Sequence, residues 1–326
     1  MRNLVRAIAG LALLLLAAAP AAAQPPLPAP VIAYRGATLL DVRSGALLRG
    51  ITIVTKGETV EALLPAGAPV PAGAETVDVA GLYAVPGLID VHQHVENGRG
   101  RRAAEAVLRR ELYSGVTAVR DMLGDARILA DLSRAARFGE LAAPDLDFAG
   151  FVAGPGYFID DRLAPLARGG MPGQVPWIQA IGPETDLPLA IARIAGTGAR
   201  GVKVYGNLDG PTVRRIAAEA HRQGLAAWAH AAVFPATPQQ VVDAGADSVS
   251  HVCMLAYQTL KAPPVSYHDR APLDQAALMR GPVHPALARL FESMKARGTV
   301  LDTTVAVYHL IERLRVEMPD HPPPTY

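Results

Sequence analysis

Two histidines, His92 and His94, close the apolar run PGLIDVHQH at residues 86–94. If this run is a strand, its side chains alternate between two faces, so both imidazoles point the same way. Two imidazoles on one strand can hold one face of a zinc-type ion. They could equally be two polar residues that end a strand, because such pairs arise by chance in a large protein.

Two further histidines end apolar runs later in the chain. LAAWAH ends in His230, and DSVSH ends in His251. Either one could be a structural histidine with satisfied hydrogen bonds. However, four of the nine histidines lie at the exits of three predicted strands, whereas accidental ones would scatter over helices and loops. The pattern therefore favours a shared metal site.

Lys203 lies inside the apolar run GVKVY, in a chain that uses lysine only four times against 27 arginines. An unpaired ammonium buried there would lose its proton or carry a large desolvation cost. A neutral lysine amine can add carbon dioxide and become a carbamate that bridges two metal ions, which arginine cannot do. The alternative is that Lys203 pairs with an acid such as Asp121.

These residues need a scaffold that brings separate strand ends together. From Tyr83 onward, short apolar runs alternate with amphipathic stretches rich in alanine and arginine, which predicts an α/β fold of βα units around a parallel sheet. The predicted strands are residues 83–91, 116–121, 146–153, 201–205, 225–230, 247–252 and 299–307. Seven such strands, with no glycine-rich phosphate loop after any of them, favour a barrel over an open nucleotide-binding sheet. In a barrel, the C-terminal strand ends carry the chemistry.

Residues 1–23 have two arginines, an apolar core from Ile8 to Ala19 and small residues at their end, which is typical of a cleavable secretory signal. The apolar core is shorter than the roughly 20 residues of a membrane-spanning helix. We therefore expect a secreted or periplasmic protein with no membrane segment after cleavage. A proline-rich lead-in follows at residues 24–30, and residues 31–84 contain short β-branched runs typical of a small sheet.

The charge balance excludes a polyanion-binding protein. Removal of residues 1–23 takes two arginines and no acid from 31 basic and 30 acidic residues, which leaves 29 against 30. We expect no nucleic-acid partner. Cys253 is the only cysteine, so an intrachain disulfide is excluded.

Taken in order and spacing, PGLIDVHQH, GVTAVRD, GVKVY, LAAWAH and DSVSH resemble the amidohydrolase superfamily, in particular its imidazolonepropionase-like and prolidase-like branch. The resemblance runs from about Val31 to Val307. It implies a (β/α)8 barrel of the TIM type at residues 85–326, preceded by the N-terminal part of a small β-sandwich at residues 31–84.

The resemblance also implies a ligand set. His92 and His94 would bind one divalent metal ion, and His230 and His251 a second, with Lys203 as a carbamate bridge and zinc as the expected metal. A single ion is an alternative. Such ions would acidify a bridging water, polarise the scissile carbonyl and lead to hydrolysis of a carbon–nitrogen bond in an amide, cyclic amide or dipeptide.

One part of the resemblance fails. The superfamily needs an aspartate at the end of an eighth strand to move the proton of the attacking water, and residues 299–307 resemble only the seventh. Neither Asp302 nor Asp320 fits that position, so we expect a barrel that is incomplete at its C-terminal end, and the catalytic residue stays unassigned. The alternatives are a truncated, non-catalytic remnant or binding module, and an ester or lactone hydrolase that uses the same metal site.

The sequence leaves the partners partly open. We expect a small-molecule or short-peptide substrate, and Tyr205, which points inward beside Lys203, could bind it or only fill the barrel. The glycine- and proline-rich insert at residues 153–177 could be a substrate lid or a loop without a role. A homo-oligomer is also left open.

Overall fold

The structure is a computed structural model that describes residues 29–159, 161–269, 273 and 282–317. The chain divides into two compact units between Pro86 and Gly87. The predicted secretory signal lies outside the described residues. Within the described ranges, no helix is both long enough and apolar enough to cross a membrane.

The first unit is a small sheet with the strand order β3-β2-β1-β4, in which β5 also pairs with β1. The strands are β1 (Val31–Leu40), β2 (Leu47–Lys56), β3 (Thr59–Leu64), β4 (Glu75–Asp78) and β5 (Tyr83–Ala84). β1 runs antiparallel to β2 and parallel to β4 and β5. Gly57 turns the chain between β2 and β3 with a φ of 56°, a conformation that favours glycine. Ala33, Ala37 and Val54 form the buried side of this sheet.

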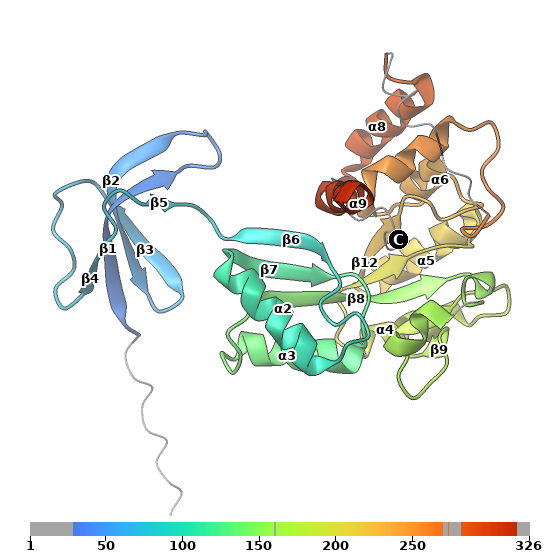
Figure 1. Cartoon of the computed structure of the whole chain (residues 1–326), viewed down its shortest axis with the longest axis horizontal. Coiled ribbons are helices and arrows are strands. Elements are labelled where there is room, and N and C mark those ends of the chain that lie inside the picture. Colours follow the sequence, from blue (N-terminus) through green and yellow to red (C-terminus); the bar gives the residue numbers. More distant parts are fainter. Residues whose placement is uncertain (1–28, 160, 270–272, 274–281, 318–326) are drawn as a thin grey trace, which may run out of the picture. The chain divides into compact units, whose positions relative to one another are not determined.

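The second unit is a nearly closed barrel of parallel strands in the order β6-β7-β8-β11-β12-β13-β14 (Figure 1). The strands are β6 (Leu88–Gln93), β7 (Val116–Asp121), β8 (Asp145–Ala153), β11 (Gly201–Val204), β12 (Ala226–His230), β13 (Ser248–Ser250) and β14 (Val300–Asp302). Two short strands, β9 (Gln174–Val175) and β10 (Ile178–Ala180), extend the sheet beside the end of β8. The predicted incomplete TIM-type barrel with a preceding small sheet is confirmed.

Helices cover the outside of these strands, and α2 and α3 lie along β7 and β8 (Figure 1). The α-helices are α2 (Arg101–Tyr113), α3 (Ala126–Arg137), α4 (Leu187–Ala195), α5 (Gly210–Arg222), α6 (Pro238–Asp243), α8 (Pro285–Arg297) and α9 (Val305–Glu317). Side-chain caps fix several of the starts: Asp209 accepts the Thr212 amide of α5, and Thr237 forms a capping box with Gln240 of α6. Each cap satisfies an amide that the helix itself leaves without a partner.

The core lies between the strands and the helices. Val202 and Val204 of β11 are buried on the outer side of the barrel, together with Ile194 of α4 and Ile216 of α5. Full burial of one such side chain contributes roughly 1.5–3 kcal/mol to folding. This alternation leaves Lys203, between the two valines, directed into the barrel.

Two of the predicted strands differ from the structure. The predicted strand 83–91 is interrupted before Gly87: β5 belongs to the first sheet and β6 to the barrel, because Pro86 between them has no amide to donate. The predicted strand 299–307 ends at Asp302, and α9 begins at Val305. The β-branched residues after Asp302 favour a strand locally, but the chain turns at Thr304, whose φ is 50°.

Part of the insert at residues 153–177 packs into the hydrophobic core of the barrel unit, through residues that include Tyr157, Leu163 and Trp177. It contains two 3-10 helices, η1 (Pro155–Tyr157) and η2 (Asp161–Leu166). Trp177 is buried and donates its indole N–H to the Leu166 carbonyl at 2.9 Å. The insert is therefore held in place by its own hydrophobic residues, and a lid function stays a prediction.

Candidate metal centre

The four histidines at the predicted strand ends lie in one row at the C-terminal end of the barrel. The ring centroid of His92 is 5.5 Å from that of His94 and 4.7 Å from that of His251. The His251 and His230 centroids are 4.5 Å apart. Residues from β6, β12 and the end of β13 are thus brought together although up to 159 positions separate them in the sequence.

Lys203 points into the same barrel interior. Its Nζ donates to the Ser250 Oγ at 3.0 Å. Because β12 lies between β11 and β13, this hydrogen bond must cross the inside of the barrel. Lys203 is only 2% exposed, and this burial lowers the pKa of its amine to about 7, despite the opposing charge of Asp302.

Lys203 does not pair with Asp121 in the structure, and the acid whose charge acts on Lys203 is Asp302. The Asp121 carboxylate accepts the backbone amides of Val95 at 2.6 Å and Leu123 at 2.9 Å. It ties the loop after β6 to the loop after β7, and burial raises its pKa to about 7. Its role in the structure is to hold these two loops together.

Asp302, which the sequence reasoning set aside, lies within the histidine row. Its Oδ2 is 2.5 Å from the Nδ1 of His92. Burial alone would raise the pKa of Asp302, but the hydrogen bond and the charges of His92 and Lys203 outweigh it and keep this pKa below its ordinary value. Asp302 is the last residue of β14, so the strand-end rule applied to the histidines would have selected it as well.

The hydrogen bonds of the imidazoles decide which ring nitrogens can bind a metal. The Nδ1 of His92 faces a carboxylate, and the Nδ1 of His94 is 3.3 Å from the Leu123 carbonyl. Because these oxygens only accept, both Nδ1 atoms carry the hydrogen, and each Nε2 keeps its lone pair. The Nδ1 of His251 lies 2.9 Å from the Thr304 hydroxyl, which can donate or accept, so this contact leaves both tautomers of His251 open. His230 differs, because its Nδ1 accepts the Ala232 amide at 2.8 Å.

The donor chemistry of these residues fits a divalent metal ion. Burial lowers the pKa of His92, lowers that of His94 to about 4, and lowers that of His251, so the rings are neutral at pH 7, as metal ligands must be. Among the described residues, no group of three or more His, Cys, Asp or Glu side chains forms a ready coordination shell. The structure thus presents His92, His94 and His251 as neutral rings, without a complete set of ligand positions in the described residues.

Tyr205 borders the histidine row. Its ring centroid is 4.5 Å from that of His230, and its hydroxyl is 3.0 Å from the Tyr267 hydroxyl. The rings of Phe151 and Tyr157 pack against it from the other side. Tyr205 therefore connects the histidines to a cluster of aromatic rings.

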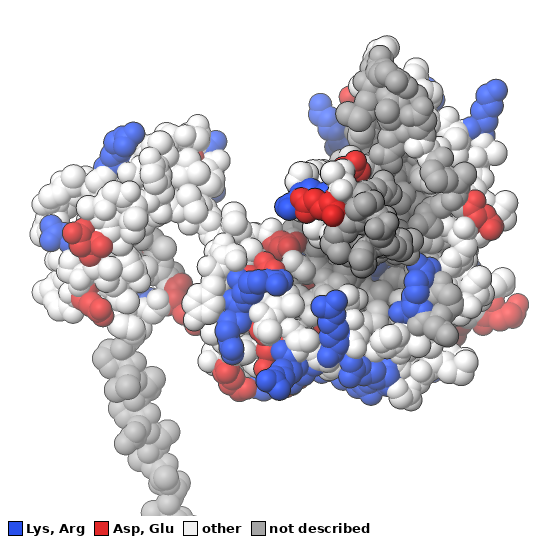
Figure 2. Space-filling view, in the orientation of Figure 1, with Lys and Arg blue, Asp and Glu red and all other residues white. Residues whose placement is uncertain are grey.

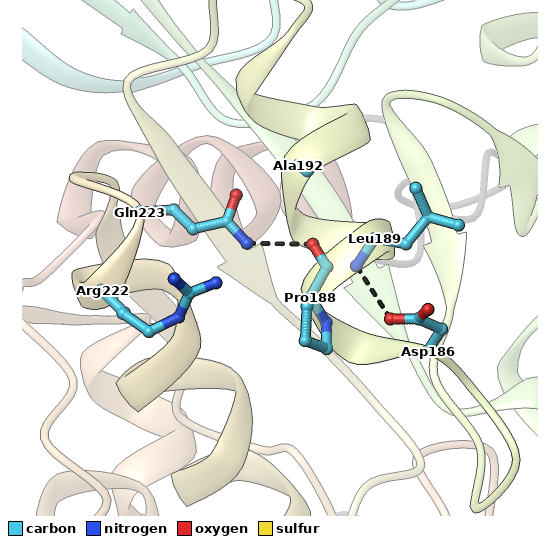
Figure 3. A pocket seen from close by; sticks show the side chains of 6 residues that line it. All are labelled: Asp186, Pro188, Leu189, Ala192, Arg222 and Gln223. Atoms are coloured by element: carbon cyan, nitrogen blue, oxygen red, sulfur yellow. Dashed lines mark hydrogen bonds between the residues drawn. The ribbon is translucent and has the colours of Figure 1, made fainter.

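A second surface feature lies away from these residues. An open depression of about 690 Å³ is lined by residues of α4 and α5 and by Asp186 and Gln223, which flank these helices (Figure 3). Inside it, Gln223 donates to the Pro188 carbonyl at 2.9 Å, and the Asp186 carboxylate accepts the Leu189 amide at 3.0 Å. None of the candidate metal ligands lines it.

Basic and acidic side chains are interspersed on the face of the barrel unit seen in Figure 2.

No protein-family model matches the chain, and no curated protein matches it. Solved structures do match. An Xaa-Pro dipeptidase with bound methionine in its active site is 18% identical with a TM-score of 0.64, and the match covers 88% of this chain and 70% of that chain. A prolidase complexed with N-methylphosphonate-L-proline is 19% identical with a TM-score of 0.60, over 88% and 83%. The A. niger ochratoxinase is 18% identical with a TM-score of 0.62, over 89% and 69%.

At these identities the similarity concerns the fold. The dipeptidase, the prolidase and the ochratoxinase share with this chain both the barrel and most of its length. The chain therefore has the fold of amidohydrolase-superfamily enzymes, as its strand-end motifs predicted.

Proposed function

We propose that the chain is a metal-dependent hydrolase that cleaves the carbon–nitrogen bond of an amide, cyclic amide or dipeptide. The observation that carries the proposal is the meeting of four histidine rings and the buried Lys203 in one barrel interior. The shared fold with a dipeptidase and a prolidase supports the same class of reaction. A small molecule or short peptide is the expected substrate.

In this proposal His92 and His94 hold one ion, and His230 and His251 hold a second, with zinc as the expected metal. In the metal-free structure the Nδ1 of His230 accepts the Ala232 amide, so this ring must give up that bond before it can bind an ion. When bound, the metal acts as a Lewis acid toward the substrate carbonyl and lowers the pKa of a water. The chain itself supplies the neutral imidazoles of His92, His94 and His251. Tyr205, beside His230, is proposed to contact the substrate.

Lys203 is proposed to carry a carbamate. With a pKa of about 7, roughly half of its amine is neutral at pH 7 and can attack carbon dioxide. A nitrogen–carbon bond forms, the amine releases one proton, and a carboxylate results on the end of the lysine chain. Such a carboxylate is a hard oxygen ligand that suits a divalent ion better than an amine. Equilibration with ¹³C-bicarbonate should give a carbamate carbon resonance that is absent from Lys203→Met.

We also propose export to the periplasm or the medium, because residues 1–23 have the layout of a cleavable signal. Export should leave a mature protein that begins at Gln24. Sequencing the N-terminus of protein recovered from the periplasm or medium tests this. A protein that keeps residues 1–23 would contradict it.

The activity is tested with purified chain that is first stripped with a chelator and then supplied with zinc. A panel of dipeptides, N-acyl amino acids, esters and lactones should show hydrolysis of at least one amide only when metal is present. His92→Ala and His251→Ala should abolish this turnover. His221→Ala is the matched control, because His221 pairs with Asp247 on the surface and should leave turnover unchanged.

The same panel separates the alternatives. Turnover of esters or lactones without any amide would favour an ester hydrolase with the same metal site. Tight zinc binding without turnover of any substrate class would favour a binding module. Either result would overturn the proposed amide hydrolysis.

A further inference from the structure

Asp302 and His92 come from the last and the first strand of the barrel. Among the described residues no backbone hydrogen bonds pair β14 with β6. The side chains of Asp302 and His92 therefore join two strands that the sheet itself leaves unpaired. We propose that Asp302 is a positioning residue for metal binding: its carboxylate fixes the hydrogen of His92 on Nδ1 and turns Nε2 toward the ion. This inference rests on the proposed metal-dependent function.

The contact is a buried hydrogen bond between an imidazole and a carboxylate. The Nδ1 of His92 and the Oδ2 of Asp302 are 2.5 Å apart, and the two side chains are only 10% and 4% exposed. A charged acceptor makes such a bond shorter and stronger than a neutral one. Because a carboxylate only accepts, the bond allows one tautomer of His92, the one whose Nε2 lone pair is available to a metal.

Asp302 is itself held on several sides. A guanidinium nitrogen of Arg120 is 3.8 Å from its Oδ2, and Arg120 is fixed by donating to the Val91 carbonyl at 2.7 Å. The Arg120 guanidinium also lies over the ring of Trp228, 4.5 Å from its centroid. The carboxylate therefore cannot rotate freely away from His92 without losing an ion pair.

The same aspartate reaches the other proposed ligands. Its backbone carbonyl accepts the amide of His251 at 2.9 Å. Ser250, which accepts the Lys203 ammonium, also hydrogen-bonds the Asp302 side chain. A single residue of β14 thus contacts His92 directly, His251 through the backbone and Lys203 through a hydroxyl. With its oxygens engaged in this way, Asp302 acts on the metal through its neighbours rather than as a ligand.

The test measures the zinc dissociation constant of the full chain by competition with a chelator. Removal of a carboxylate behind a metal-binding histidine weakens binding about 10- to 100-fold, and we expect this for Asp302→Ala. Asp302→Asn should weaken binding clearly less, because its amide oxygen can still accept the His92 Nδ1 hydrogen. Asp147→Asn removes an exposed carboxylate that faces Arg200 and should leave the affinity unchanged.

A second measurement does not depend on metal. Nitrogen NMR of the metal-free wild-type chain should show His92 with its hydrogen on Nδ1, and Asp302→Ala should shift the population toward Nε2. Thermal unfolding of each metal-free variant shows whether it is folded when its affinity is measured.

The outcomes distinguish a failure of this inference from a failure of the proposed metal-dependent function on which it rests. A wild-type chain that does not bind zinc would overturn both. A wild-type chain that binds zinc, with equal affinity in Asp302→Ala, would overturn the positioning role alone. Equal losses of zinc affinity in Asp302→Ala and Asp302→Asn would assign the effect to the charge of Asp302 rather than to the orientation of His92. A wild-type His92 that carries its hydrogen on Nε2 would exclude the proposed hydrogen bond.

Discussion

The ammonium of Lys203 donates to the Ser250 hydroxyl at 3.0 Å across the barrel interior, and no carboxylate lies within ion-pair distance of it in the described residues. A neutral hydroxyl replaces less of the lost hydration of an ammonium than a carboxylate does. This is why burial lowers the pKa of Lys203 to about 7. Lys203 therefore destabilises the metal-free fold. Its presence at this position is better explained by function than by stability.

Replacement of Lys203 by Met should stabilise the metal-free protein at pH 7 by about 1–4 kcal/mol while it abolishes the proposed hydrolysis. Between the folded pKa of about 7 and the ordinary value of 10.5, the unfolded chain binds more protons than the folded one. Wild-type stability should therefore rise with pH through this window, and Lys203→Met should lose that slope. Urea unfolding in carbonate-free buffer at about pH 7 and about pH 9 measures both effects. A variant that is less stable than wild type at pH 7 would contradict the prediction.

Zinc should stabilise the folded chain, because the ligands converge only when the barrel is formed. At a free concentration of about 100 times the dissociation constant, a ligand that binds only the native state adds about 2.7 kcal/mol. Thermal unfolding should shift upward with zinc and return after chelation. His94→Ala should abolish this shift, whereas His221→Ala should keep it even if its own starting stability differs. An equal shift in both variants would place zinc elsewhere on the protein.

Local patterns in the sequence were sufficient to predict the barrel and the convergence of its histidines. The alternation of side chains within GVKVY places Lys203 inside the barrel because its neighbouring valines must face the helices. His230 follows from the same logic at the end of β12. These inferences depend on two or three adjacent residues, so no knowledge of distant contacts was needed.

Contacts between distant segments could not be predicted in this way. The pairing of His92 with Asp302 joins residues 210 positions apart and depends on how the last strand approaches the first. The partners of Asp121 are backbone amides of two loops, and no side-chain pattern identifies a backbone donor. Residues 305–307 favour a strand by their composition, but the turn at Thr304 begins a helix. In each case the tertiary context overrides the local preference.

Glu219 provides a pH-dependent contribution to stability on the surface. Its carboxylate accepts hydrogen bonds from Arg222 at 2.5 and 2.8 Å and from Gln223 at 2.5 Å, and these lower its pKa to about 2. The stabilisation should be complete above the ordinary pKa of 4.5 and should be lost as the pH falls toward 2. Because Arg222 is well exposed, Glu219→Gln should cost only about 0.5–1 kcal/mol at pH 7.

Urea unfolding of wild type and Glu219→Gln at several pH values checks this contribution. The difference in unfolding free energy should be constant from neutral pH down to about pH 5 and should shrink below it. A difference that does not change with pH would show that the effect comes from packing of the side chain rather than from its charge.

Gly150 of β8 allows α4 to pack directly on the strand. A Cβ at this position would overlap the Cγ2 of Ile194 and lie 2.9 Å from its Cγ1. Gly150→Ala should therefore destabilise the protein by about 1–3 kcal/mol, because both the strand and the helix are fixed by their other contacts. Urea unfolding gives the value directly.

The cause is tested by a double-mutant cycle. Ile194→Ala alone should cost about 2–5 kcal/mol, because it leaves a cavity in the core. If the overlap is the reason for the loss in Gly150→Ala, the double variant should be more stable than the sum of the single losses by about 0.5–3 kcal/mol. Gly156→Ala is the control, since the nearest atom to its new Cβ would be the Asn207 Nδ2 at 3.4 Å, and its effect should stay within about 0.5 kcal/mol. Strict additivity of the two core substitutions would instead place the cost of Gly150→Ala in the strand itself.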